Sequence, residues 1–242
     1  MLSDYNCRIF DISRFNFLNT ETDDMLSVEL EKAKDDIVSM TRCGFHRFVC
    51  HVRHNQDIST AYTKANIKRL HEIAQKTLPR DCGKISLNFV PKLYFSPDAP
   101  YIKNIHALAI KNTNRIFVEL PLDANPCHVP ETLNRLLYHC NLVPVFTEFQ
   151  LYAMLYDPKE IEKMLRIKGA AFQFNIKNIC EPQNLKLIKK ILKEENTVLL
   201  GTNCSHEHLN VNEIAACIQK FKRAITDTVY RDIVINAGRF LK

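Results

Sequence analysis

Residues 115–152, RIFVELPLDANPCHVPETLNRLLYHCNLVPVFTEFQLY, contain a complete strand–helix–strand unit. The continuous apolar and β-branched run at 116–120 predicts a strand that is buried on both faces. Pro130 suits the first turn of a helix, and the apolar residues after it recur at helical spacing, so that one face of this helix can cover a sheet. A second apolar run at 142–147 predicts the next strand. The unit therefore favours a parallel α/β fold.

Two carboxylates stand at or just past the C-terminal ends of these two strands, namely Glu119 and Glu148. Parallel α/β folds bind their ligands at that edge of the sheet. A pair of carboxylates on neighbouring strands can also be driven to different pKa values and act as acid and base. Structural roles for both residues are the alternative, because no nucleophile is evident beside them.

Strands and helices alternate along almost the whole chain outside this unit. Strands are expected at 8–12, 46–52, 84–90 with an extension to 95, 170–175 and 197–201, helices at 25–40, 61–78, 158–167, 181–194, 211–225 and 229–235, and a hairpin from 106–110 and 115–120. The alternation predicts a largely parallel sheet with right-handed crossovers, closed or nearly closed as a barrel. Without a Pro, Gly or Ser-rich linker, we expect one domain spanning residues 1–242.

The composition excludes several classes of protein. With 46% hydrophobic and 25% charged residues and only 5 Gly, the chain is globular rather than disordered or fibrous. No apolar run approaches the roughly 20 residues of a membrane span, and no signal peptide is recognisable, so we expect a cytoplasmic protein. The formal charge of +6 is not gathered into basic runs with interleaved aromatics, which argues against nucleic acid as a partner. The 9 Cys contain no CxxC pair, which predicts reduced thiols rather than a cysteine zinc site.

The predicted topology gathers several polar residues at the C-terminal ends of the strands. They are Asp11 at the end of the first predicted strand, Arg53 and His54 after the second, and Lys92, Glu119, Glu148, Asn203 and His206 after the later ones. His206 is either a displaced metal ligand or part of a solvated loop. His54 either contacts a phosphate or a metal, or lies in the wall of the barrel together with His51.

Several local sequences are similar to one family of bacterial phosphatases. They are LYFSPD at 93–98, FVEL at 117–120, LVPV at 142–145, LLGTN at 199–203 and NAGRFL at 236–241. These segments and the order of elements resemble the manganese-dependent tyrosine phosphatases of capsule and exopolysaccharide loci, in the polymerase and histidinol phosphatase (PHP) superfamily. The resemblance implies a distorted TIM-like (β/α)7 barrel of the PHP type, a metal cluster at the strand C-termini, and hydrolysis of phosphotyrosine on a partner kinase.

The departures from the family pattern fall on its metal ligands. In place of D-x-H-x-H after the first strand the chain has Asp11-Ile12-Ser13-Arg14-Phe15, and Arg53 stands where the second strand should deliver a histidine. Lys92 replaces the bridging glutamate, Glu148 replaces the histidine after Pro-Val, and Asn203-Cys204-Ser205 replaces the late D-x-H pair. Asp11 and Glu119 match. Charged Lys and Arg have no lone pair to give a metal ion, so the resemblance implies a degenerate pocket.

The leading interpretation is that ion pairs from Arg53 and Lys92 to Asp11, Glu119 and Glu148 replace the metals. The protein would then have no catalytic residue and no cofactor, and would bind or regulate a bacterial tyrosine kinase or another protein of polysaccharide biosynthesis. Alternatively, Lys92 and Arg53 hold an anion such as a phosphate or a uronic acid.

Two further alternatives stay open. One is an active Mn²⁺-dependent phosphoesterase whose rebuilt site has fewer metals and uses Asp11, His54, Glu119, Glu148 and His206. The other is a purely structural role in an assembly.

Overall fold

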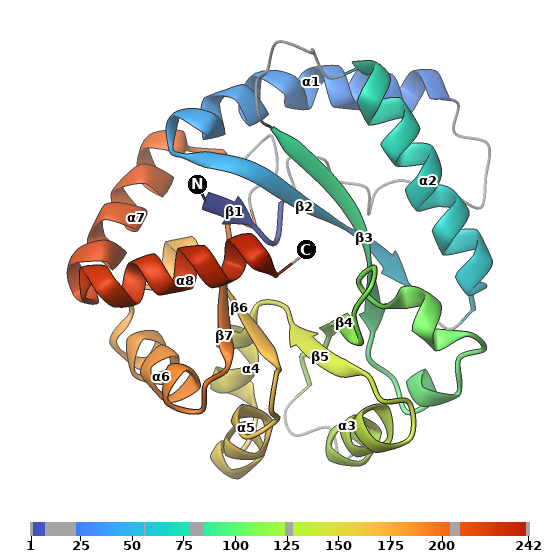
Figure 1. Cartoon of the computed structure of the whole chain (residues 1–242), viewed down its shortest axis with the longest axis vertical. Helices are drawn as coiled ribbons and strands as arrows, with labels where there is room; N and C mark the ends of the chain where they lie inside the picture. Colours follow the sequence, from blue (N-terminus) through green and yellow to red (C-terminus); the bar gives the residue numbers. More distant parts are fainter. Residues whose placement is uncertain are drawn as a thin grey trace.

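Seven parallel strands follow one another in sequence order, and each is hydrogen-bonded to the next (Figure 1). The computed structural model describes residues 2–7, 23–55, 57–77, 85–123, 128–203 and 209–240. The strands are β1 (Leu2–Asp4), β2 (Phe45–His54), β3 (Ser86–Tyr94), β4 (Arg115–Glu119), β5 (Val143–Phe146), β6 (Ala171–Asn175) and β7 (Thr197–Gly201). The amide of Tyr5 donates to the carbonyl of Leu200 at 2.8 Å, and the amide of Asn203 donates to the carbonyl of Asn6 at 2.9 Å. These bonds join the first strand to the last, and the predicted α/β barrel is confirmed.

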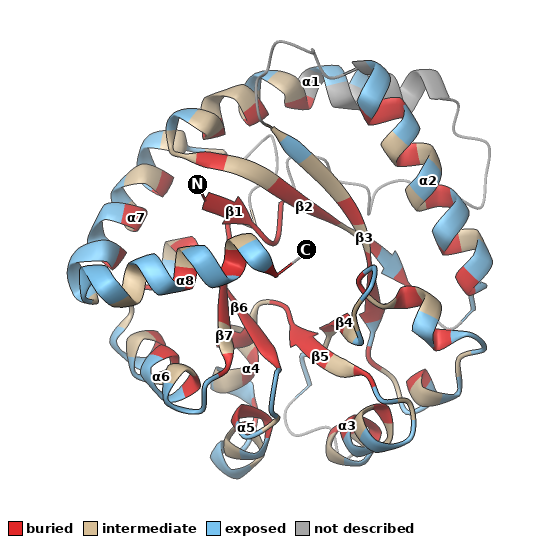
Figure 2. Cartoon of the chain, viewed as in Figure 1, coloured by how far each residue is buried: buried red, intermediate tan, exposed pale blue. Residues whose placement is uncertain are grey.

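Helices surround the strands as an outer ring (Figure 1). They are α1 (Asp23–Arg42), α2 (Thr60–Thr77), α3 (Val129–Tyr138), α4 (Phe149–Leu155), α5 (Pro158–Leu165), α6 (Pro182–Lys193), α7 (Val211–Ala224) and α8 (Asp227–Arg239), with short 3-10 turns at Ala99–Tyr101, Ile105–Leu108 and Ile176–Asn178. Buried residues line the sheet and the inward faces of the helices, whereas the outward faces are exposed (Figure 2). This division follows from the amphipathic spacing of the helix sequences.

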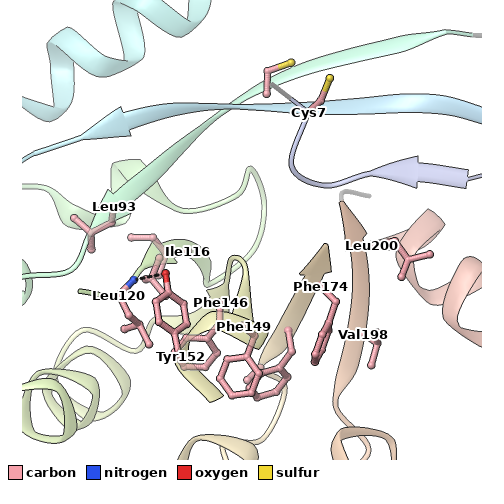
Figure 3. Packing of buried hydrophobic residues seen from close by; sticks show 14 of the residues in the cluster. Cys7, Leu93, Ile116, Leu120, Phe146, Phe149, Tyr152, Phe174, Val198 and Leu200 are labelled. Atoms are coloured by element: carbon pink, nitrogen blue, oxygen red, sulfur yellow. Dashed lines mark hydrogen bonds between the residues drawn. The ribbon is translucent and has the colours of Figure 1, made fainter. Parts of the chain in front are cut away.

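The core has two parts, one on each face of the sheet. Between the sheet and the helices, Phe146 and Phe149 lie with ring centroids 5.6 Å apart, close to Tyr152 (Figure 3). Inside the barrel, side chains from successive strands fill the axis, among them Val49 and Phe117. Fully burying each of these apolar side chains stabilises the fold by about 1.5–3 kcal/mol.

Helix α8 covers the end of the barrel where the strands begin. Ala237 and Phe240 pack into the interior cluster. Arg47, near the start of β2, donates from its guanidinium to the carbonyl of Gly238 at 2.7 Å, and the Arg115 guanidinium lies 4.7 Å from the centroid of the Phe240 ring. The opposite end, where the strands terminate, is therefore the end available for a site.

Some expected elements differ in the structure. The predicted first strand at 8–12 lies outside the described residues, and the strand that begins the sheet is β1, at Leu2–Asp4. The predicted hairpin is wrong, because residues Ile105–Leu108 form a 3-10 helix rather than a strand. Helix α4 was not expected. Within the described ranges no helix is both long and apolar enough to span a membrane.

Candidate functional site

Three neighbouring strands deliver charged side chains to the C-terminal mouth of the barrel. In the parallel register, Arg53 of β2 is the partner of Lys92 of β3, and Tyr94 of β3 is the partner of Glu119 of β4. Side chains alternate between the two faces of a strand, and paired residues share a face. Phe117, two residues before Glu119, lies in the interior cluster. Arg53, Lys92 and Glu119 therefore all belong to the interior face of the sheet.

Both cations contact the same carboxylate. The Lys92 ammonium nitrogen lies 2.6 Å from Oε2 of Glu119, and an Arg53 guanidinium nitrogen lies 3.4 Å from Oε1 of Glu119. The Lys92 side chain is only 7% exposed and that of Glu119 25% exposed, whereas the Arg53 side chain is 47% exposed and lies 4.5 Å over the ring of Tyr94. The shielded Lys92–Glu119 pair is thus the stronger contact, since solvent screens an exposed pair.

On the other side of the mouth, amide side chains connect the ends of β5, β6, β7 and β1. The Asn203 amide donates to Oε1 of Glu148 at 2.6 Å, and the Asn6 amide donates to Oδ1 of Asn203 at 3.4 Å. The backbone amide of Glu148 donates to the Gln173 side-chain oxygen at 2.7 Å. The Glu148 carboxylate therefore accepts from Asn203, and its backbone amide is fixed by Gln173. The pairing of Glu148 with Arg53 or Lys92 stays a prediction.

Two of these residues have strained backbones. Glu148 has φ 53° and Asn203 has φ 51°, both in the left-handed region. Asn tolerates this region, but for Glu it costs on the order of 1–2 kcal/mol. Such strain persists where surrounding contacts enforce it, and it is concentrated at functional sites.

Gly201, the last residue of β7, lets two of the amides approach closely. A Cβ atom at this position would lie 2.4 Å from the Gln173 side-chain nitrogen and 2.8 Å from Cβ of Asn6. Any larger residue would have to displace one of them. The absence of a side chain at Gly201 is therefore what allows Gln173 and Asn6 to pack together at the mouth.

Asp4 ties the end of β1 to the end of β7. Its fully buried carboxyl accepts hydrogen bonds from the backbone amide of Thr202 at 2.9 Å, the Thr202 hydroxyl at 2.6 Å and the amide of Asn6 at 3.1 Å. Burial raises the pKa of Asp4, and the hydrogen bonds from Thr202 and Asn6 oppose that shift. The Asp4 carboxyl thus has a structural role, because its hydrogen bonds join β1 to the end of β7.

The position of β1 also moves the family motif. Since the first strand ends at Asp4, the segment that follows the first strand is Asp4-Tyr5-Asn6-Cys7-Arg8 and not the one that begins at Asp11. Asn6 and Arg8 then stand where the D-x-H-x-H pattern has its histidines. Neither of these residues is a histidine, so the loss of the family's two histidine ligands stays a prediction at this position.

Tyr152 of α4 lies between the two acidic positions. Its hydroxyl oxygen accepts a hydrogen bond from the amide of Leu120 at 3.1 Å (Figure 3). Burial raises the pKa of Tyr152 well above its ordinary value, and the negative charges of Glu119 and Glu148 raise it further. The phenol therefore stays protonated at neutral pH and cannot act as a base.

Of the histidines proposed for the site, His54 does not join it. His54 is fully buried on the face of β2 opposite to Arg53, where its Nδ1 is 2.8 Å from the hydroxyl of Thr63 in α2, and burial lowers its pKa. The Nε2–H of His51 donates to the carbonyl of Tyr5 at 2.8 Å, and its ring lies edge-on to Phe117 of the interior cluster, with ring centroids 4.6 Å apart. Asp11 and His206 lie outside the described residues, as do Cys204 and His208.

Sequence reasoning missed Asn6, Gln173 and Tyr152. Asn6 was missed because the first strand was placed too late in the chain. Gln173 lies two residues after the interior Ala171 of β6, so strand alternation could have found it. Tyr152 gave no signal, because helix α4 was not expected.

Comparison with known proteins places this architecture in a family. The sequence profile described as "Capsular polysaccharide synthesis, CpsB/CapC" matches residues 21–242. The chain belongs to the CpsB/CapC family. No curated protein matches the CpsB/CapC-family chain significantly.

A solved structure supports the fold of this family member, and a second match is weaker. One is a chain from the crystal structures of YwqE from Bacillus subtilis and CpsB from Streptococcus pneumoniae, described as unique metal-dependent tyrosine phosphatases. It is 14% identical, has a TM-score of 0.63, and the match covers 99% of this chain and 94% of that one. The apo homocysteine methyltransferase MmuM from Escherichia coli matches at 13% identity over 91% of this chain and 95% of that one, with a TM-score of only 0.38.

The described residues do not fit a metal cluster of the kind that a metal-dependent relative needs. Among them, no group of three or more His, Cys, Asp or Glu side chains lies close enough together to hold a metal ion. Both oxygens of Glu119 face cations, and Oε1 of Glu148 accepts from Asn203. A metal ion bound at Glu119 would have to displace the Lys92 ammonium, which occupies the same position with the same sign of charge.

Proposed function

We propose that this protein is a catalytically inactive member of the CpsB/CapC family that binds or regulates another component of capsule or exopolysaccharide biosynthesis. The observation that carries the proposal is the shielded ion pair at 2.6 Å between Lys92 and Glu119. An ammonium group at this place supplies positive charge without activating water, which a bound metal ion would do. The barrel keeps its shape while the chemistry is lost.

The same proposal covers location and partner. Cys43, Cys50, Cys140, Cys180 and Cys217 are free thiols, as expected for a reducing compartment, which supports placement in the cytoplasm. The family description supports a partner within polysaccharide synthesis. A bacterial tyrosine kinase is the partner that we propose. Binding at the barrel mouth predicts that Lys92→Glu weakens the complex, whereas a purely structural partner would tolerate that change.

Metal content and hydrolysis test the proposal together. Purified protein is incubated with MnCl₂, freed of excess metal and assayed for bound metal and for hydrolysis of a phosphotyrosine peptide and p-nitrophenyl phosphate. We expect no stoichiometric manganese and no hydrolysis above background. The Glu119→Gln variant is the control, because a contaminating phosphatase would give equal activity in both preparations.

The opposite outcome would identify an active enzyme. Stoichiometric metal together with hydrolysis that disappears in Glu119→Gln would contradict the proposal. In that case the chain is a metal-dependent phosphoesterase with a rebuilt site, and Asp11, Glu148 and His206 become the next residues to substitute.

A further inference from the structure

An open groove lies between α3 and α5, which are neighbours in the outer ring of helices (Figure 1). Its volume is about 690 Å³, within the range of ligand and peptide sites. One face of α3 forms one wall, and α5 with the turn after it forms the other. The groove is therefore a feature of the outer wall, distinct from the mouth where Lys92 and Glu119 meet.

The floor and one wall of this groove are apolar. Leu133 and Met164 are buried at its base, and Leu137 and Ile167 are half-buried beside them. Tyr138 lines the groove near the end of α3 with 81% of its surface exposed. An exposed aromatic next to an apolar depression is typical of protein-binding surfaces, where aromatic residues are enriched.

The other wall is basic. Lys163, Arg166 and Lys168 line it and are exposed, and the acid among them, Glu160, is bonded to Lys163 at 2.7 Å. Within the described part of the chain neither Arg166 nor Lys168 forms an ion pair. The groove thus has an excess of two positive charges beside its apolar floor.

We propose that the groove between α3 and α5 docks an acidic, amphipathic polypeptide segment of a partner protein. Apolar side chains of the segment would enter the depression between Leu133 and Met164, and its carboxylates would lie against Arg166 and Lys168. A helix or strand with one apolar face fits such a groove, as in other helix-in-groove complexes. The partner's acidity follows from charge complementarity, which sets association rate and specificity.

The other possible occupants fit less well. A second copy of this chain has a formal charge of +6 and would bring like charge toward a basic wall. An anionic membrane would satisfy the cations, but a flat bilayer surface does not fill a concave groove whose apolar residues lie at its base.

The test measures peptide binding by fluorescence anisotropy at low salt and at physiological salt. The probe is a fluorescein-labelled peptide in which Leu recurs at helical spacing and the remaining positions are Glu or Ala. A second peptide has Gln in place of every Glu. The proteins are the wild type, the double variant Arg166→Glu/Lys168→Glu, Tyr138→Ala, and the matched control Lys64→Glu/Lys68→Glu on α2, which reverses the same number of exposed charges elsewhere.

We expect the acidic peptide to bind the wild type and the α2 control equally, and to bind Arg166→Glu/Lys168→Glu about tenfold or more weakly. Tyr138→Ala should bind a few-fold more weakly, and the Gln peptide should bind poorly to every protein.

Three results would overturn the inference. Equal weakening by both double variants would show non-specific attraction to a basic protein. Equal binding of the acidic and Gln peptides would show that the cations play no part. The third result is that the wild type binds no peptide but sediments with phosphatidylglycerol vesicles, and that Arg166→Glu/Lys168→Glu abolishes this sedimentation. It would identify a membrane contact instead.

Discussion

Replacing Lys92 with Met should destabilise the fold by about 3 kcal/mol. At 2.6 Å from Glu119, a unit charge pair is worth about 6 kcal/mol at an effective dielectric constant of about 20, before the cost of removing the ammonium from water. Removing one partner of a buried pair costs about 3–5 kcal/mol. The lower end applies, because Glu119 is 25% exposed and keeps its contact with Arg53 at 3.4 Å. Met preserves the apolar stem of Lys, so lost packing contributes little.

Urea denaturation and thermal melting measure this loss. For a chain of this length the melting temperature should fall by about 6 °C or more. A double-mutant cycle with Glu119→Gln isolates the interaction, since Lys92→Met should cost about 1 kcal/mol or less once the carboxylate is gone. The same cost in both backgrounds, or no cost in the wild type, would refute the reasoning.

Two further predictions concern buried positions. Burial lowers the pKa of His54 below its ordinary value of about 6.5, so the unfolded chain takes up the proton first and stability falls as the pH drops below that value. Urea denaturation at about pH 7 and about pH 5 should show a smaller difference for His54→Asn than for the wild type. Gly201→Ala should cost about 1–3 kcal/mol, because the added Cβ would lie 2.4 Å from the Gln173 side chain. Gly238→Ala in helix α8 is the control, because a Cβ added at this position would have no neighbouring atom within 4 Å. This variant should be more stable than the wild type by about 0.5–1 kcal/mol. Equal changes in stability for the two variants would contradict the crowding argument.

Long periodic segments made most of the barrel predictable. The unit β4–α3–β5 was expected because its strands are continuous apolar runs and its helix has one apolar face. Strand β1 was not, because Leu2–Asp4 is three residues long and contains two polar side chains. Its place in the sheet depends on Asp4 bonding to Thr202, and such a contact across the whole chain leaves no local pattern. A strand specified by tertiary contacts cannot be read from propensity.

Residues of the candidate site could be predicted from the sequence only where the C-terminal end of their strand could be predicted. Lys92 and Glu119 could be placed together because both lie near the C-terminal ends of strands that the apolar runs predicted, whereas the register came from the structure. His54 was included although it is adjacent in sequence to Arg53, and successive residues of a strand face opposite sides. The contact between Glu148 and Gln173 was not anticipated, because the inward-facing residues of β6 had not been identified.

The hydroxyl of Tyr5 donates to the carbonyl of Ala237, across 232 residues of chain. A ribosome adds about 5–20 residues per second, so at least about 12 s separate the synthesis of the two partners. During that interval the early strands have an open edge, the feature that recruits chaperones or neighbouring nascent chains. We therefore expect the first strand to need shelter until α8 has been synthesised.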